Sequence, residues 1–182
     1  MTPAPDPPES DLELVRRFQA GEDRAFDRLV EIHRRDVYRL AYRLLGNHAD
    51  ADDRAQDAFL RAYRALPRFR AEATFRTWLT RIVLNLAADR RRERGGIRPV
   101  PLDELPPGEQ PAVSARVPAL LGEAALHRAV GQLPPRQRET LILRVFQEMR
   151  FHEIAKVMGC TVGTAKANFF HALRGLRERV GG

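Results

Sequence analysis

Apolar residues recur along most of this chain at the spacing of amphipathic helices. The clearest run is Phe26, Leu29, Val30, His33, Val37, Leu40, Ala41 and Leu44. Intervals of three and four residues place such side chains on one face of a helix, turned toward a core. Gly46-Asn47 follows this run, as in helices that end with a left-handed residue. No stretch of any length alternates apolar and polar residues as a strand does, so the pattern predicts an all-α fold.

Start and stop signals predict three more helices in the first half of the chain. Ser10 and Glu13 match a capping box, which predicts a short helix over residues 11–20. A further helix is expected over residues 50–66, where Pro67 ends it. The last begins near Thr74 and runs into a basic segment at residues 90–94. Its expected buried side chains are Phe75, Trp78, Leu79, Ile82, Val83 and Leu86.

Composition divides the chain into two small helical domains. Residues 1–10 contain four prolines and predict a disordered tail before a first domain at 11–95. Residues 96–118 are rich in proline and acidic residues, which predicts a flexible linker. A second domain is expected at 119–182. Its predicted helices cover residues 120–132, 135–148, 151–158 and 162–180.

The last two predicted helices have the pattern of a helix-turn-helix. Ile154 and Met158 lie on the inner face of the first, and Gly159 stands where a tight turn favours glycine. The inner face of the second helix is formed by Val162, Ala165, Phe169, Ala172, Leu173 and Leu176. In a helix-turn-helix the second helix enters the major groove of DNA. A helical hairpin without a DNA role shows the same pattern, and both interpretations stay open at this point.

Helical phase selects the side chains of this second helix that would meet DNA. They face away from the core or flank that face: Thr164, Lys166, Ala167, Asn168, Phe170, His171 and Arg174. Lys166 and Arg174 would contact phosphates, and Asn168 or His171 would reach base edges. Phe170 would touch a thymine methyl group or pack on another helix of the domain.

The first domain carries two further candidate surfaces. One is a stripe on the helix at 50–66, formed by Asp53, Gln56, Asp57 and Leu60. It would dock a basic helix of a partner protein, although a solvated face is the commoner meaning of such a stripe.

The second surface combines a loop with one flank of the next helix. The loop contributes Arg68, Phe69, Arg70 and Thr74, and the flank contributes Arg81, Asn85 and Arg92. Basic groups beside a loop that can hold an unstacked base are what single-strand recognition requires. Phe69 would either stack on a base or anchor its own loop.

Charge and composition narrow the function classes without deciding among them. A net charge of +7 permits a polyanionic partner. Cys160 is the only cysteine, which fits a reducing compartment, and no signal peptide or membrane span is evident, so a cytoplasmic location is expected. The five histidines lack ligand spacing and no phosphate-binding glycine loop occurs. We therefore expect no catalytic residue, metal or cofactor, and not an enzyme.

Two long segments together resemble bacterial sigma factors of the extracytoplasmic-function (ECF) type, in the sigma-70 family. The first covers residues 37–92 and begins VYRLAYRLLGNHADADDRAQDAF; the second covers residues 133–178 and includes RFHEIAKVMGCTVGTAKANFFHAL. The resemblance implies a subunit that directs RNA polymerase to promoters. Asp57 stands where the family more often has Glu, and AKANFFHAL departs from the common pattern, so no upstream promoter sequence is carried over.

The resemblance also implies roles for the candidate surfaces. The stripe at Asp53 would dock on core RNA polymerase at the beta-prime clamp, and the beta flap would be a second contact. The loop and flank around Asn85 would capture the melted non-template strand of the minus-ten element. The helix at 162–174 would read the minus-thirty-five duplex, and an anti-sigma factor is an expected partner. The alternative is a stand-alone helix-turn-helix regulator, which would need a dimerisation or ligand-sensing surface.

Overall fold

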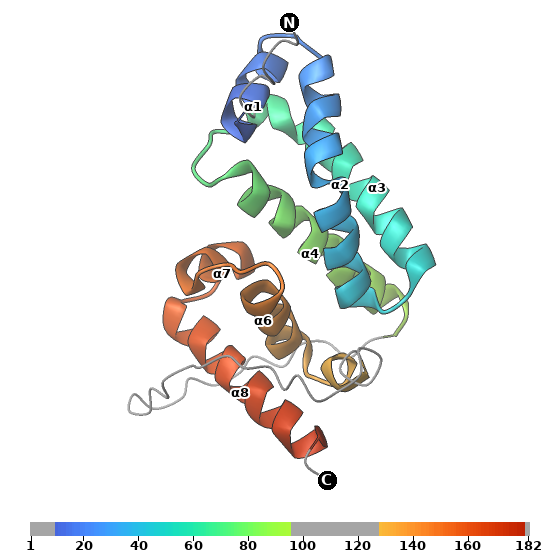
Figure 1. Ribbon diagram of the computed structural model, residues 1–182, viewed down its shortest axis with the longest axis vertical. Coiled ribbons are helices and arrows are strands. Elements are labelled where there is room, and N and C mark those ends of the chain that lie inside the picture. Colours follow the sequence, from blue (N-terminus) through green and yellow to red (C-terminus); the bar gives the residue numbers. More distant parts are fainter. Residues whose placement is uncertain (1–9, 96–127, 181–182) are drawn as a thin grey trace, which may run out of the picture.

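The computed structural model describes residues 10–95 and 128–180, and every regular element in those two ranges is helical (Figure 1). The prediction of two small all-α domains is confirmed. The elements in chain order are α1 (Asp11–Gln19), α2 (Arg24–Leu45), α3 (His48–Ala65), the short 3-10 helix η1 (Leu66–Arg68), α4 (Phe75–Glu93), α6 (Pro135–Val145), α7 (Phe151–Met158) and α8 (Val162–Val180). The tail and linker predictions lie outside the described residues.

Side-chain caps fix where the helices of the first domain begin. The hydroxyl of Ser10 accepts a hydrogen bond from the Glu13 amide at 3.3 Å, and the Asn47 side chain accepts one from the Asp50 amide at 2.8 Å. Gly46 ends α2 with a φ of 79°, in the left-handed region that glycine enters without a steric cost. These caps explain why the predicted helix boundaries lie within about two residues of the observed ones.

The first domain is a bundle in which α2 packs on α1, α3 and α4. Its fully buried side chains include Leu14, Leu29, Leu44, Leu66, Leu79 and Leu86. Along α4, Phe75, Leu79, Val83 and Leu86 are buried as predicted, whereas Trp78 and Ile82 are only half-buried. Thr77, Thr80, Leu84 and Ala87 are buried as well. Their burial fits the position of α4, which packs on both α2 and α3 and, in the second domain, on α7.

The second domain packs α8 against α6 and α7. The rings of Phe151 and Phe169 meet edge-to-face, with centroids 5.7 Å apart, in its core. Gly159 has a φ of 64° between α7 and α8, so the tight turn is present. Val162 is exposed and Leu173 half-buried, and the core is formed mainly by Ala165, Phe169, Ala172 and Leu176.

Two predictions for this domain need revision. The helix predicted over 135–148 ends at Val145, because the Met149 amide donates back to the Leu143 carbonyl and Glu148 adopts a φ of 54°. Of the helix predicted over 120–132, residues 128–131 are helical and the remainder up to residue 127 is outside the described residues.

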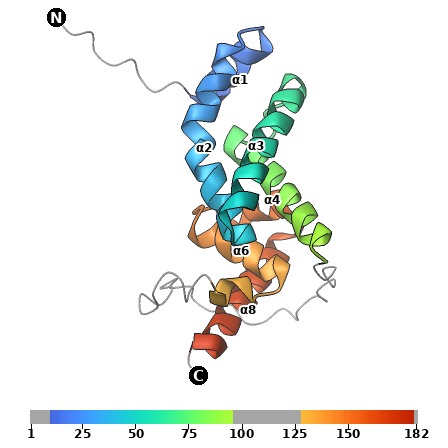
Figure 2. The ribbon, with the colours of Figure 1, turned by 90° about the vertical axis from the view of Figure 1, so that its right-hand side faces the viewer.

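The two domains pack directly against each other. Contacts join α4 to α7 and α2 to α6, and Figure 2 shows α6 beside the lower ends of α2 and α4. Within the described ranges, no helix is both long enough and apolar enough to cross a membrane.

Candidate nucleic-acid and protein interfaces

The stripe on α3 is accessible along its length. Asp53 and Gln56 are exposed, Asp57 is half-buried, and Leu60 leaves 56% of its surface in solvent. Arg54 approaches Asp57 to 2.9 Å between Nη1 and Oδ2, so part of the acidic charge is balanced within the helix. What remains is an acidic and amide surface around one large exposed apolar side chain. This combination suits a partner that brings both a basic group and an apolar contact.

A buried carboxylate that the sequence analysis did not single out fixes the start of α3. Asp50 accepts from Asn47 at 2.7 Å and from Arg90 at 2.9 Å, and it also pairs with Arg94 at 2.6 Å. The hydrogen bonds from Asn47 and then Arg90 hold the pKa of Asp50 below its ordinary value. Because Arg90 and Arg94 lie at the end of α4, this cluster ties the α3 stripe to α4.

A side chain of α1 holds the loop before α4 in place. The Gln19 side-chain amide donates to the carbonyl groups of Leu66 and Phe69, each at 3.0 Å. Ala71 adopts a φ of 55°, which turns the chain sharply within the loop. Arg68 and Arg70 are exposed on it. The sequence pattern does not single out Gln19, because its hydrogen-bond partners Leu66 and Phe69 are about fifty residues away along the chain.

Two residues of this loop have structural contacts of their own. The Phe69 ring is half-buried, with its centroid 5.0 Å from that of Trp78, so Phe69 anchors the loop to the core. The Thr74 hydroxyl accepts from the Thr77 amide at 3.1 Å and donates to the Thr77 hydroxyl, which makes Thr74 the N-cap of α4. Stacking of a base on Phe69 and binding of DNA by Thr74 stay predictions.

The flank of α4 lies open to solvent. Arg81, Asn85 and Arg92 are all exposed at intervals of four and seven residues, so they share one side of the helix. Arg92 pairs with Asp89, one turn back. The loop with Arg68 and Arg70 precedes the same helix, so basic groups lie on both the loop and the flank.

On α8, the outward face is largely as the helical phase predicts. Lys166, Phe170 and Arg174 are exposed, and Thr164, Ala167 and His171 are half-buried. Burial, and to a lesser extent the charge of Arg174, lowers the pKa of His171, so its imidazole is neutral at pH 7. A neutral imidazole both donates and accepts hydrogen bonds, which suits a base edge more than a phosphate. The Thr161 hydroxyl accepts from the Thr164 amide at 3.0 Å, and it caps this helix.

The placement predicted for Asn168 is wrong. Its side chain is only 3% exposed, on the same face of α8 as Ala165 and Ala172. Asn168 is three residues from Ala165 and four from Ala172, so it lies on the buried face of the helix. Because Asn is a polar residue type, the sequence pattern does not reveal this burial. Asn168 is therefore a buried polar residue of the domain and not part of its outward face.

Comparison with known proteins identifies the family. Residues 29–96 match the family model described as Sigma-70 region 2, and residues 123–176 match that described as Sigma-70, region 4. The RNA polymerase sigma-H factor of Pseudomonas aeruginosa is 38% identical over 175 residues, which cover 90% of each chain. The ECF RNA polymerase sigma factor SigM of Mycobacterium tuberculosis is 34% identical, over 94% of this chain and 85% of that protein. This chain belongs to the ECF RNA polymerase sigma factors.

Solved structures support the same fold for this ECF sigma factor. CnrH, in complex with the cytosolic domain of CnrY, has a TM-score of 0.71 at 24% identity, covering 95% of this chain and 98% of that one. The sigma factor RpoE of Bartonella quintana, in complex with the anti-sigma factor NepR, has a TM-score of 0.67 at 22% identity, covering 86% and 96%. Sigma factors are regulatory subunits of RNA polymerase and not themselves enzymes.

Proposed function

We propose that this ECF sigma factor binds core RNA polymerase through the α3 stripe and reads a promoter with two separate surfaces. The observation that carries the proposal is that both matched regions present an exposed, basic helix face. In the region 2 match this is the α4 flank with Arg81 and Asn85; in the region 4 match it is α8 with Lys166 and Arg174.

The α4 surface suits a single strand. Arg68 and Arg70 on the loop and Arg81 and Arg92 on the helix supply charges that follow a phosphate backbone. Asn85 lies between the helical arginines with an exposed amide, which offers donors and acceptors to a base edge. We assign it to the melted minus-ten strand.

The α8 surface suits a duplex. It belongs to a helix-turn-helix whose second helix is exposed from its first turn onward, as entry into a major groove requires. Lys166 and Arg174 would contact phosphates, while Phe170 and His171 would face the bases of the minus-thirty-five element.

The α3 stripe is the surface we assign to the polymerase clamp. Replacing Asp53 with Arg and Gln56 with Ala cancels the net negative charge of the stripe without removing a buried group, so we expect a loss of core binding of at least about tenfold with unchanged thermal stability. The matched control is Asp27→Arg, which makes the same charge change at an exposed position of α2. Affinity is measured by fluorescence anisotropy of the labelled chain titrated with core polymerase. Equal affinity of the stripe variant and the control would refute this docking surface.

A protein inhibitor is a further expected partner. The solved complex of RpoE with NepR is one of a sigma factor with its anti-sigma factor, and this chain shares that fold. We propose that an anti-sigma factor of the same general kind acts on this chain. Affinity capture with the purified full chain, followed by a competition assay against core polymerase, tests this, and a captured protein that does not compete would contradict it.

A further inference from the structure

The outward face of α8 is apolar over its first two turns. Gly163, Ala167 and Phe170 are separated by four and three residues, so at about 3.6 residues per turn they form one line along the helix. Gly163 and Phe170 are exposed, and Ala167 is half-buried. The core residues Ala165 and Phe169 lie on the opposite side of the helix. These three residues, here named the α8 line, are therefore the centre of the surface that α8 turns away from its own domain.

The hydrogen-bonding side chains near the start of α8 lie beside this line and not on it. The Thr164 hydroxyl is 2.9 Å from the Thr161 hydroxyl, within the cap of the helix. Asn168 is buried, and Lys166 is exposed on one flank of the line. Guanine edges are read by Arg or Lys, and adenine edges by Asn or Gln. The α8 line itself has no side chain that offers a hydrogen bond to either base.

Glycine at position 163 is explained by neither packing nor backbone strain. A Cβ atom on Gly163 would meet Thr161 Oγ1 at 3.7 Å, which is an ordinary van der Waals contact. Glycine is also a poor helix former, so its own helix gains nothing from it. The missing side chain does let the backbone at the start of α8 approach a ligand closely. In a helix-turn-helix, the start of the second helix is the part that contacts base edges.

Phe170 is a large apolar side chain that its domain leaves partly uncovered. Its exposed fraction is 36%, and its ring meets that of His171 with centroids 5.8 Å apart and planes at 64°. This contact comes from the next residue along the chain, so it orients the Phe170 ring without burying it. The apolar group that bases present in the major groove is the C5-methyl group of thymine. Phe170 is therefore complementary to thymine.

Ala167 extends the same apolar contact toward the start of the helix. Ala167 and Phe170 are about 4.5 Å apart along the helix axis, at 1.5 Å per residue, and base pairs are stacked about 3.4 Å apart. The two side chains can thus meet methyl groups of neighbouring base pairs. Alanine and phenylalanine are both residue types that make this contact with thymine.

We propose that α8 reads its duplex element through thymine methyl groups, with Phe170 and Ala167 as the specificity-determining contacts and Gly163 as the position that permits close approach. The inference rests on the assignment of α8 to duplex DNA in the proposed function, and it adds the base chemistry that is read. The element should contain successive thymines on one strand where the α8 line enters the groove. Lys166 and Arg174 then contribute affinity through phosphates and no preference among bases.

Removal of the methyl groups alone tests this inference. The full chain is assembled with core polymerase, and duplexes that the complex selects from a random pool define the upstream element. Deoxyuridine then replaces each thymine of that element, which removes the methyl group and keeps the pairing edge. We expect about fourfold weaker binding for each contacted methyl group in a gel shift. The slope of log K against log salt should stay unchanged, because no phosphate contact is lost. Deoxyuridine outside the element is the DNA control.

Variants of the α8 line give the matching test on the protein. Phe170→Ala should bind the thymine duplex about tenfold more weakly and should no longer distinguish thymine from uracil at the position it faces. Gly163→Ala should weaken binding without lowering the thermal unfolding midpoint, because its Cβ has space within the domain. Ile32→Ala is the control, since it truncates an exposed apolar side chain of α2. Circular dichroism verifies the folding of each variant.

The outcomes separate this inference from the proposed function. Wild-type binding that is unchanged by uracil, or a Phe170→Ala variant that remains as sensitive to uracil as wild type, would overturn the inference even if chain-dependent transcription occurs. Methyl-dependent binding to duplexes that support no transcription would leave the inference standing and contradict the proposed function. A complex that selects no duplex from the pool would contradict both.

Discussion

At the scale of single residues, the side chains that organise the candidate surfaces are mostly not the ones that would touch DNA. Gln19 holds the loop before α4, Asp50 joins α3 to α4, and Thr161 caps α8. Gln19 and Asp50 make hydrogen bonds to groups that the fold brings near, whereas Thr161 accepts from the Thr164 amide three residues along the chain. A polar residue that contacts the backbone of a distant segment has no periodic signature, so the sequence pattern does not distinguish it from a solvated residue.

Asp50 gives a prediction on the dependence of stability on pH. Its pKa is lower in the folded chain than in the unfolded one, so its charge stabilises the fold above its ordinary pKa of about 3.9. This contribution disappears as pH falls through the lowered value. We expect Asp50→Asn to reduce the thermal unfolding midpoint at pH 7, and we expect its difference from wild type to narrow as pH falls below that ordinary value. Thermal melts followed by circular dichroism measure this, with exposed Asp52→Asn as the control. A difference between Asp50→Asn and wild type that is constant from pH 7 to pH 3 would contradict the assignment.

Arg174 gives a prediction on DNA binding. Its exposed guanidinium lies on the outward face of α8, where we assign it to a phosphate. Arg174→Ala should weaken binding of the minus-thirty-five duplex by the polymerase complex and reduce the slope of log K against log salt by about one. The control is Arg34→Ala on α2, which should leave the slope unchanged. A slope identical to wild type for both variants would remove Arg174 from the phosphate contacts.

At the scale of elements, the ends of a helix were predictable where residues close in sequence determine them. Ser10 and Gly159 mark a start and a stop by chemistry that involves a few neighbouring residues, and α7 and α8 have the predicted bounds. The early end of α6 depends on a non-glycine residue, Glu148, in a left-handed conformation, which sequence patterns disfavour. The position of Asn168 was predicted wrongly for a different reason. A polar residue type favours an exposed site, whereas its spacing from Ala165 and Ala172 places it in the core.

Thr74 tests whether the start of α4 is a structural or a DNA-contacting position. Its hydroxyl is engaged with Thr77, so Thr74→Ala should cost about 1 kcal/mol of stability, the usual cost of losing an N-cap. Thr74→Ser retains the cap and should recover most of that loss. Urea unfolding of both variants gives the comparison. If Thr74→Ala is as stable as wild type yet fails in promoter opening, the residue acts on DNA directly.

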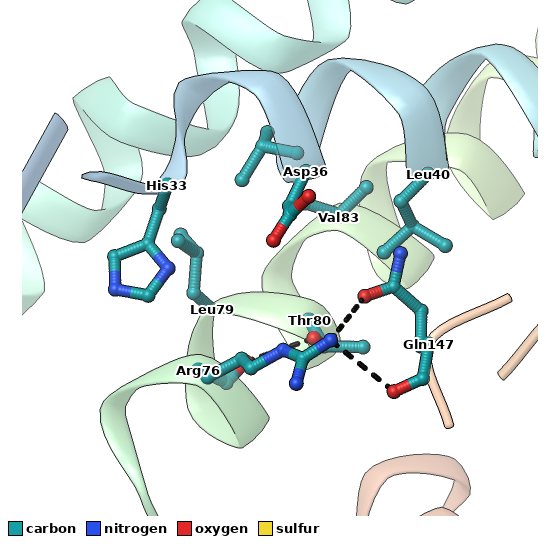
Figure 3. A pocket seen from close by; sticks show the side chains of 9 residues that line it. His33, Asp36, Leu40, Arg76, Leu79, Thr80, Val83 and Gln147 are labelled. Carbon is teal, nitrogen blue, oxygen red and sulfur yellow. Dashed lines mark hydrogen bonds between the residues drawn. The ribbon is translucent and has the colours of Figure 1, made fainter. Parts of the chain in front are cut away.

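At the scale of the whole molecule, the resemblance over two segments gave the family, and the comparisons confirm it. The direct packing of the two domains was not predictable in the same way. It depends on pairs such as Arg76 with Gln147 (Figure 3) and Arg91 with Glu139. Within the sequence pattern of its own domain, each of these side chains looks like an ordinary solvent-exposed polar residue. The periodic spacing of apolar residues reports burial within one domain, so it does not reveal polar contacts between two domains.

Asn85 carries the prediction on strand opening. With its exposed amide on the α4 flank, we expect Asn85→Ala to lower promoter opening by about tenfold while the closed complex still forms. Permanganate reactivity of minus-ten thymines reports opening, and a gel shift reports the closed complex. Arg35→Ala serves as the control. Equal losses in both assays would place Asn85 in initial binding instead.

Run-off transcription tests the central claim most directly. Core polymerase is reconstituted with the full chain and given a library of genomic fragments, with core alone as the reference. We predict discrete start sites that depend on the chain, each preceded by the same two sequence elements at a fixed spacing. Transcripts that are identical with and without the chain, despite its binding to core polymerase, would contradict the account.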